Sequence, residues 1–186
     1  MSLRVRYTNQ NGFYTGDSSY AIAWLALGNR TACDAQFLRA FRYMNGLSGT
    51  PATATQYNPF QVFKEREQSG GHINFLTGAG GFLQNVIQGY AGWRARDASL
   101  DFRPVLPPFA QVVRLVGLHF AGSRFTLEFN ETSMSVELLA ESDNGRIALS
   151  CEQSAISSAC WPERHTLRVG GKLSLPLAEF SLVVLL

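Results

Sequence analysis

Residues 57–96 read YNPFQVFKEREQSGGHINFLTGAGGFLQNVIQGYAGWRAR, and the pattern of the chain changes across this stretch. The sequence before it repeats apolar residues at helical spacing, whereas the sequence after it alternates as strands do. The stretch itself is polar in its first half and carries the tightest glycine clusters of the chain. Since the type of fold changes beside a polar, glycine-rich segment, we look for a functional site here.

The second half of this stretch predicts a helix over residues 77–89. Its apolar stripe consists of Phe82, Leu83, Val86 and Ile87. Its first turn is crowded by three glycines, Gly78, Gly80 and Gly81. Because each glycine costs a helix up to about 1 kcal/mol relative to alanine, the cluster needs a reason. It indicates close backbone approach, either by a neighbouring helix or by a ligand at the helix N-terminus.

Two further helices are predicted upstream, over residues 20–27 and 34–47. Asp17, Ser18 and Ser19 are N-cap candidates for the first, and Gly28 with Asn29 signals its end. The first helix is apolar nearly all round, which indicates burial on several sides. Three such helices cannot bury their own apolar faces, so they either oligomerise or belong to a larger helical domain. We favour the larger domain.

From residue 98 onward the chain consists of short segments rich in Val, Leu and Phe, bounded by Gly, Asn, Ser or Pro. Residues 100–102 and the following prolines mark a boundary before them. The predicted strands cover residues 112–120, 124–129, 133–139, 147–151, 165–169 and 180–186. Short strands at regular spacing predict an all-β sandwich or a small barrel. The expected fold class is therefore α+β, a helical part followed by an antiparallel β part.

Composition excludes several classes of partner. The chain has 186 residues, of which 46% are hydrophobic and only 16% charged, so part of its surface is expected to be covered. A net charge of +2 argues against nucleic acid, and the lack of an 18-residue apolar run argues against a membrane span. The N-terminus lacks a signal-peptide pattern, so a cytoplasmic location is expected.

Cysteines and histidines give no sign of a metal site. The odd count of three, Cys33, Cys151 and Cys160, favours a reducing compartment and leaves open a bridge between the last two. None of them, and none of the three scattered histidines, has metal-ligand spacing. We therefore expect no metal and no cofactor.

Residues 70–94, GGHINFLTGAGGFLQNVIQGYAGWR, resemble the end of the catalytic barrel in glycoside hydrolase family 65. DSSYAIAWLALGN at residues 17–29 and NPFQVFKE at residues 58–65 are similar to the segments that precede this motif in the same family. The family consists of an N-terminal β-sandwich, an (α/α)6 barrel and a small C-terminal β-sandwich. The resemblance therefore implies that residues 1–98 are the last barrel helices and residues 99–186 the C-terminal β-sandwich. The remainder of the barrel is expected in the full-length protein.

The resemblance also implies an enzyme that hydrolyses α-glucosides with inversion. Such a reaction needs a general acid on the leaving oxygen and a carboxylate that activates water on the opposite face. Glu65 occupies the position of the general base, and Glu67 is its competitor two residues on. The general acid belongs to an earlier barrel helix, so no residue is named for it here and the isolated chain is expected to be inactive.

Three further residues are assigned to substrate binding by the same resemblance. His72 falls near the loop that binds phosphate in the family's phosphorylases, but a neighbouring glutamate would repel phosphate, which favours a hydrolase. Ser18 and Ser19 are candidates to line the same pocket, with helix capping as the alternative. Trp24 and Trp93 are expected in the core rather than on a sugar, because both lie in apolar helical context.

The form INFLTGAGGFLQ at residues 73–84 is closest to the members that release glucose from glucosyl-galactosyl-hydroxylysine of collagen-type glycans. An acid trehalase or a disaccharide phosphorylase of the same family is the alternative. A second alternative, of another class, is a non-catalytic carbohydrate-binding or structural β-sandwich module.

Overall fold

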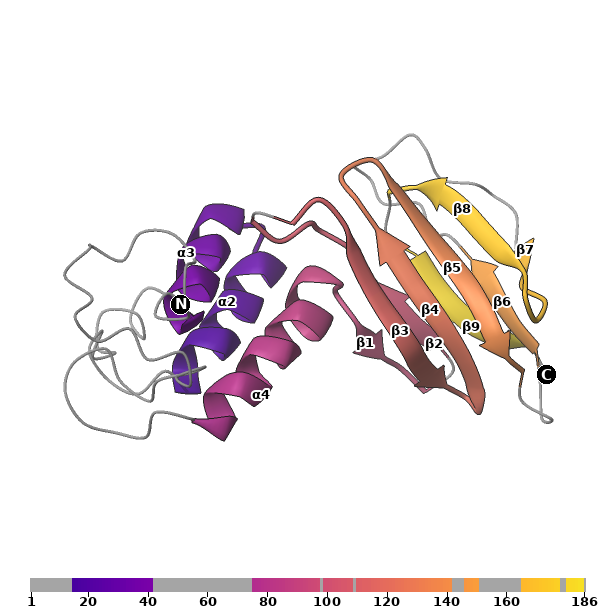
Figure 1. Ribbon diagram of the computed structural model, residues 1–186, viewed down its shortest axis with the longest axis horizontal. Coiled ribbons are helices and arrows are strands. Elements are labelled where there is room, and N and C mark those ends of the chain that lie inside the picture. Colours follow the sequence, from indigo (N-terminus) through magenta and orange to yellow (C-terminus); the bar gives the residue numbers. More distant parts are fainter. Residues whose placement is uncertain are drawn as a thin grey trace. The chain divides into compact units, whose positions relative to one another are not determined.

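The computed structural model describes residues 15–41, 75–97, 99–108, 110–141, 146–150, 165–177 and 180–185. The chain forms two compact units, Met1–Gly89 and Tyr90–Leu186, and each is considered by itself. The described part of the first unit is helical, and that of the second is made of strands (Figure 1). The predicted order, helices before an antiparallel β part, is therefore confirmed.

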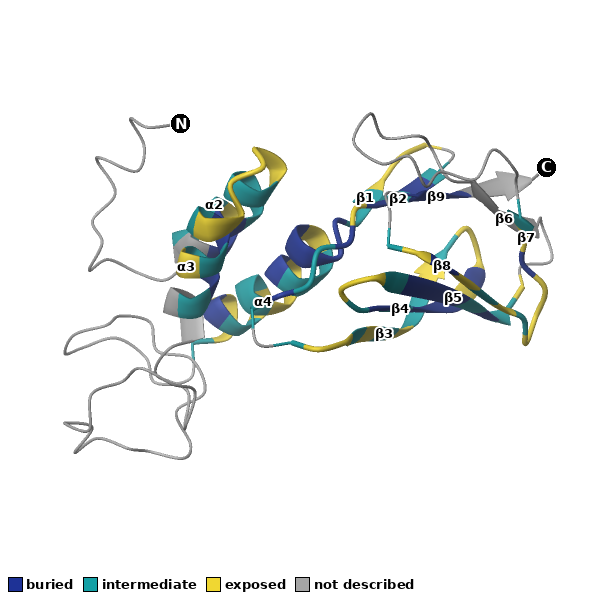
Figure 2. Ribbon diagram, turned by 90° about the horizontal axis from the view of Figure 1, so that it is seen from above, coloured by how far each residue is buried: buried dark blue, intermediate teal, exposed yellow. Residues whose placement is uncertain are grey.

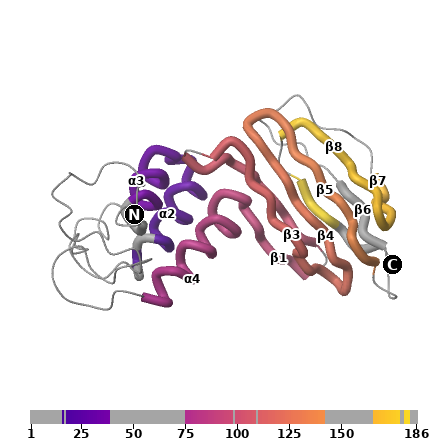
Figure 3. Tube along the Cα trace, viewed as in Figure 1, coloured from indigo at the N-terminus to yellow at the C-terminus, as the bar shows by residue number. Residues whose placement is uncertain are grey.

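The helical unit contains α2 (Thr15–Ala26), α3 (Arg30–Phe41) and α4 (Leu76–Gln84), the last continued by a π-helix, η1 (Asn85–Tyr90). Helices α2 and α3 lie side by side as a hairpin, which the trace of the chain shows clearly (Figure 3). Their interior includes Ala21 and Cys33, both fully buried, and Phe37. The ring of Phe37 stacks on Phe82 of α4, with the ring centroids 5.3 Å apart, so all three helices share one small core.

The turn between α2 and α3 contains the predicted C-cap. The N–H of Gly28 donates to the carbonyl oxygen of Leu25, and that of Asn29 donates to the carbonyl oxygen of Trp24. With φ of +76° at Gly28, these two bonds form a Schellman motif. The side-chain oxygen of Asn29 then accepts from the N–H of Ala32 at 3.0 Å, so this residue also caps the N-terminus of α3.

The starts of both helices differ from the prediction. Helix α2 begins at Thr15, so residues 17–19 lie inside its first turns instead of capping it. Helix α3 begins at Arg30, four residues before the predicted start, because Asn29 supplies its cap.

The second unit is a β-sandwich of two antiparallel sheets. Its strands are β1 (Arg94–Ala95), β2 (Ser99–Phe102), β3 (Val113–Phe120), β4 (Ser123–Phe129), β5 (Ser133–Ala140), β6 (Arg146–Ser150), β7 (His165–Thr166), β8 (Lys172–Pro176) and β9 (Phe180–Leu185). One sheet has the order β1-β2-β9-β6-β7 and the other β3-β4-β5-β8. The two sheets lie face to face, with their buried residues between them (Figure 2).

Alternating apolar residues of both sheets fill the space between them, as period-two side-chain alternation requires. Phe102 of β2 stacks on its register partner Phe180 of β9, with centroids 4.9 Å apart. The same Phe102 ring meets Phe125 of β4 edge-on at 6.2 Å, which joins the two sheets. Trp93 packs against this core, with its ring centroid 5.9 Å from that of Phe102. The predicted core role of Trp93 is therefore confirmed.

A β-bulge sets the register of β3 on β4. Leu115 pairs with Leu127, but the next regular pair joins Leu118 to Phe125, so β3 carries one extra residue. Gly117 lies within the bulge with φ of +71°, a conformation that L-residues rarely adopt. Since the extra residue shifts the alternation by one, Leu118 packs against the sandwich core just as Leu115 does.

Three strands were not predicted. Residues 100–102 were expected to mark a boundary, but they belong to β2, which pairs with β9 inside the sandwich. Strand β1 has only two residues, and β8 ends at a proline, so each gives a weak sequence signal. The predicted strands from β3 to β6 and β9 are present, with no end shifted by more than one residue. The predicted strand at 165–169 shortens to β7.

Candidate active site

Helix α4 belongs to the family motif at residues 70–94, and it packs against α2 along one seam. A Cβ atom added to Gly81 would lie 2.6 Å from Oγ of Ser18, closer than any real contact. Ser18 is only 3% exposed, so its hydroxyl group has little room to move away. Of the two explanations for the glycine cluster, the neighbouring helix is therefore confirmed for Gly81.

The other two glycines of the cluster have different surroundings. Gly78 is buried within the helical unit. Gly80 is exposed, and a Cβ atom added there would meet none of the other described residues within 4 Å. Packing against α2 thus explains Gly81, but it does not explain Gly80.

One turn beyond Gly81, the seam encloses an amide. Asn85 is fully buried, and among the described residues neither its Nδ2 nor its Oδ1 has a hydrogen-bond partner. A Cβ atom on Gly89 would collide with this Oδ1 and would lie 3.4 Å from Ile22 of α2, so Gly89 makes the space for the amide. An enclosed amide without a partner costs about 1–3 kcal/mol, which makes Asn85 a weak point of the helical unit.

The structure separates the two serines that were assigned to substrate binding. Ser18 is buried against Gly81, whereas Ser19 is exposed on another side of α2. The candidate base Glu65, its competitor Glu67 and the candidate binding residue His72 lie outside the described residues. The described part of the chain therefore brings none of the five predicted site residues together.

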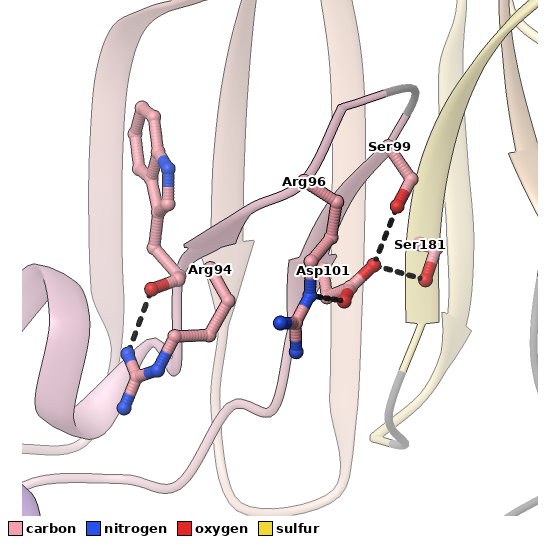
Figure 4. Close-up of polar contacts among 6 residues, drawn as sticks. Arg94, Arg96, Ser99, Asp101 and Ser181 are labelled. Atoms are coloured by element: carbon pink, nitrogen blue, oxygen red, sulfur yellow. Dashed lines mark hydrogen bonds and ion pairs between the residues drawn. The ribbon is translucent and has the colours of Figure 1, made fainter.

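The sandwich holds a polar cluster that the sequence reasoning missed, centred on Asp101 of β2 (Figure 4). Its Oδ2 accepts a hydrogen bond from Nε of Arg96 at 2.9 Å. Its Oδ1 accepts from Oγ of Ser181 on β9 at 2.8 Å and from Oγ of Ser99 at 3.0 Å. Beside it, Nη1 of Arg94 donates to the carbonyl oxygen of Trp93 at 2.7 Å.

Two opposing effects set the charge state of Asp101. Burial on its own raises the pKa of the Asp101 carboxyl group. The hydrogen bonds from Arg96, Ser181 and Ser99, with the positive charge of Arg96, outweigh burial and hold this pKa below its ordinary value. Asp101 is therefore an anion at neutral pH, and its hydrogen bonds link Arg96 in the turn before β2 to Ser99 of β2 and Ser181 of β9.

This arrangement suits a structural tie better than catalysis, because both carboxylate oxygens already accept hydrogen bonds. In SLDF, the sequence of β2, side chains alternate between the two faces of the strand, so Ser99 and Asp101 lie on the face opposite Leu100 and Phe102. This alternation is the sequence signal from which the polar cluster could have been found.

Among the described residues, no three or more His, Cys, Asp or Glu side chains gather as metal ligands would. Nor does any described helix have the length and apolar character needed to cross a membrane.

Comparison with known proteins gives a consistent set of relatives. Protein-glucosylgalactosylhydroxylysine glucosidase of Dictyostelium discoideum is 33% identical over 122 residues, which are 66% of this chain and 15% of the relative. The protein of the same name in Mus musculus is 29% identical over 161 residues, 86% of this chain and 21% of the relative. That in Danio rerio is 32% identical over 119 residues, 63% of this chain and 16% of the relative. The chain thus spans no more than about a fifth of these relatives.

A solved structure shares the fold. A putative kojibiose phosphorylase from the human microbiome superposes with a TM-score of 0.52 over 89% of this chain and 20% of its own, at 13% sequence identity. No family model matches the chain. The named relatives confirm the resemblance to protein-glucosylgalactosylhydroxylysine glucosidases and glycoside hydrolase family 65, and the solved structure confirms the shared fold, for the part of those proteins that the chain covers.

Proposed function

We propose that this chain is part of a glycosidase that releases glucose from glucosyl-galactosyl-hydroxylysine of collagen-type glycans. The observation that supports this most directly is the shared name of the relatives, each a protein-glucosylgalactosylhydroxylysine glucosidase. Residues 1–98 are proposed as the last helices of an (α/α)6 barrel and residues 99–186 as its C-terminal sandwich domain. The location is proposed to be cytoplasmic.

In this proposal Glu65 is the general base of an inverting reaction. Its carboxylate removes a proton from the water that attacks the glucose C1 atom, while a general acid protonates the leaving galactosyl oxygen. The acid is proposed to lie in chain that this sequence does not include, so the 186 residues alone are not expected to turn over substrate. The proposed substrate-binding residues are His72, Ser18, Ser19 and Glu67. Because Ser18 is buried, it can contact substrate only if the residues packed around it move apart.

Substitution of Glu65 in a polypeptide that covers the full length of the relatives tests the proposal. Glu65→Gln is expected to lower kcat by about 10²–10⁴-fold, the usual contribution of a proton-transfer group, with the unfolding midpoint unchanged. Glu67→Gln is the comparison, and because Glu67 is a proposed substrate-binding residue, it should raise KM while lowering kcat far less than Glu65→Gln does. If Glu67→Gln loses activity and Glu65→Gln keeps it, the base is Glu67. Wild-type rates in both variants would refute a catalytic role for this segment.

The substrate is tested separately. The same enzyme is expected to hydrolyse glucosyl-galactosyl-hydroxylysine faster than trehalose, and to release glucose without inorganic phosphate. A preference for trehalose, or a requirement for phosphate, would instead favour the acid trehalase or the disaccharide phosphorylase.

A non-catalytic β-sandwich module is the second candidate. One observation favours it: the buried core cluster of the sandwich is drawn entirely from residues 91–182, so the sandwich has a core of its own. Binding of an α-glucoside oligosaccharide to residues 90–186 alone, measured by calorimetry, would support a carbohydrate-binding module. Absence of binding would leave the sandwich with a structural role beside the barrel.

A further inference from the structure

Helix α4 and its π-helical continuation bury an unpaired amide against α2. Asn85 is fully buried, and neither polar atom of its side chain has a hydrogen-bond partner among the described residues. Both atoms are also shielded from solvent, so a water molecule or another protein segment can reach them only if the surrounding residues move. The amide therefore lacks hydrogen bonds that water would give it in an open arrangement, and Asn85 disfavours the closed packing of the two helices.

The backbone of the helix changes at the same residue. The N–H of Asn85 is shared between the carbonyl oxygens of Gly81 and Phe82, and the π-helix η1 starts at Asn85. Short π-helical segments are rare and are frequently found at functional sites. An irregular turn and an unpaired amide therefore coincide beside α2.

At the positions around Asn85, the seam between α2 and α4 buries little apolar surface. Gly81 faces Ser18, and Gly89 faces Ile22, so Ile22 is the one large apolar side chain among these four residues. Separation along the seam is expected to expose less apolar surface than unfolding of the α2–α3 hairpin, whose interior includes the fully buried Cys33. Since local opening favours regions with few buried apolar contacts, the seam is expected to open before the hairpin unfolds.

We propose that α4 separates from α2 along this seam in the native protein, and that the unpaired amide of Asn85 lowers the free energy of the opening. The stack of Phe37 on Phe82 holds α4 on α3 while the α2 side opens, so the movement is a pivot and not an unfolding of the unit. Opening exposes the hydroxyl group of Ser18, which is buried in the closed arrangement. The use of this movement, to let Ser18 reach substrate, rests on the proposed function, whereas the movement itself does not.

Thiol labelling of the 186-residue chain measures the opening directly. Cysteine is introduced at Ser18, with Cys151 and Cys160 replaced by serine, and peptide mass spectrometry follows the new thiol and the buried Cys33 separately. Ser18→Cys is expected to react at least about ten-fold faster than Cys33, because the seam opens more often than the hairpin unfolds. Ser19→Cys, on an exposed side of α2, is the matched control and should react at the rate of an unprotected thiol.

Removal of the amide tests the role of Asn85. Asn85→Leu keeps the branched shape of the side chain without its polar atoms, and it is expected to slow the labelling of Ser18→Cys by about 5–150-fold, the factor that corresponds to the cost of an unsatisfied buried amide. Asn85→Ala is the second variant, because it adds no atoms beside Gly89, and it should slow the labelling as well. Labelling of Ser19→Cys should not change in either variant.

Two results would overturn the proposal. Equal labelling of Ser18→Cys and Cys33 would show that Ser18 is exposed only when the whole helical unit unfolds. An unchanged or faster rate for Ser18→Cys in both Asn85 variants would show that the amide does not favour opening. No substrate is present in these measurements, so their outcome does not depend on whether Glu65 is the general base, and a failed test of Glu65 would leave the opening of the seam untouched.

Discussion

At the scale of single residues, the charge of Asp101 is expected to matter for stability and to do so in a pH-dependent way. Its folded-state pKa is lowered, so its contribution is present above the unfolded pKa of about 3.9 and is lost as pH falls through the folded pKa. Asp101→Asn should therefore cost about 1–2 kcal/mol at pH 7, because the neutral amide keeps only one acceptor oxygen and accepts weaker hydrogen bonds from Ser181, Ser99 and Arg96 than the carboxylate does. The cost should be smaller at pH 3 than at pH 7, because pH 3 lies below the unfolded pKa. Urea unfolding at both pH values measures the difference.

The neighbouring Asp97 serves as the control for this pH effect. It is exposed in the turn between β1 and β2, and Asp97→Asn should change the free energy of unfolding by less than about 0.5 kcal/mol at either pH. The exposed ion pair between Arg96 and Asp101 should add little, because solvent screens it. An equal loss for Asp101→Asn at pH 7 and pH 3 would show that the charge of Asp101 is not the source of its effect.

The role of a residue could be predicted from the sequence where its interaction partners lie within a few positions along the chain. Gly28 was predicted as a C-cap, because a helix end needs a left-handed residue and the signal lies within a few positions. The N-cap role of Asn29 was equally local and was available from the same signals. Asp101 bonds to Ser181, eighty residues away, and no local pattern reveals such a partner.

At the scale of secondary-structure elements, the register of β3 on β4 is expected to depend on the bulge at Gly117. With φ of +71° and no atom within 4 Å of an added Cβ, Gly117→Ala should cost about 1–2 kcal/mol through backbone strain alone. Gly117→Asn should cost less, because asparagine tolerates this conformation better. Chemical denaturation measures both. If the alanine and asparagine variants were as stable as wild type, the positive φ at Gly117 would not be needed for the register.

The elements most clearly predicted were those with a sustained apolar period. The apolar residues of β4 and β5 recur at every second position of the sequence, and both strands were placed within one residue, whereas the spacing in β3 changes from two to three between Leu115 and Leu118. That change is visible in the sequence and marks the bulge. The switch from α4 to the π-helix at Asn85 has no comparable signal, because residues 77–89 keep one helical stripe.

At the scale of the whole molecule, sequence periodicity predicted that a helical part precedes a β part. It did not predict how the candidate site residues are arranged. The predicted base and two of its neighbours lie outside the described residues, and Ser18 is enclosed by a contact with Gly81 that no local pattern shows. The exposed leucines of α4 belong to this scale as well, because helical periodicity says that a face is apolar but not what covers it. What the sequence cannot supply here is therefore long-range packing.

The last prediction concerns the independence of the β unit. Every residue of the sandwich core cluster lies between residues 91 and 182, so residues 90–186 expressed alone should unfold cooperatively, with a midpoint within a few degrees of the same transition in the whole chain. Phe102→Ala should abolish or greatly weaken this transition, because the ring contacts Trp93, Phe125 and Phe180 and its loss costs about 3–5 kcal/mol. The exposed Val116→Ala is the control and should have little effect. Circular dichroism melts measure all three, and a gradual, non-cooperative melt of residues 90–186 would show that the sandwich needs the helical unit in order to fold.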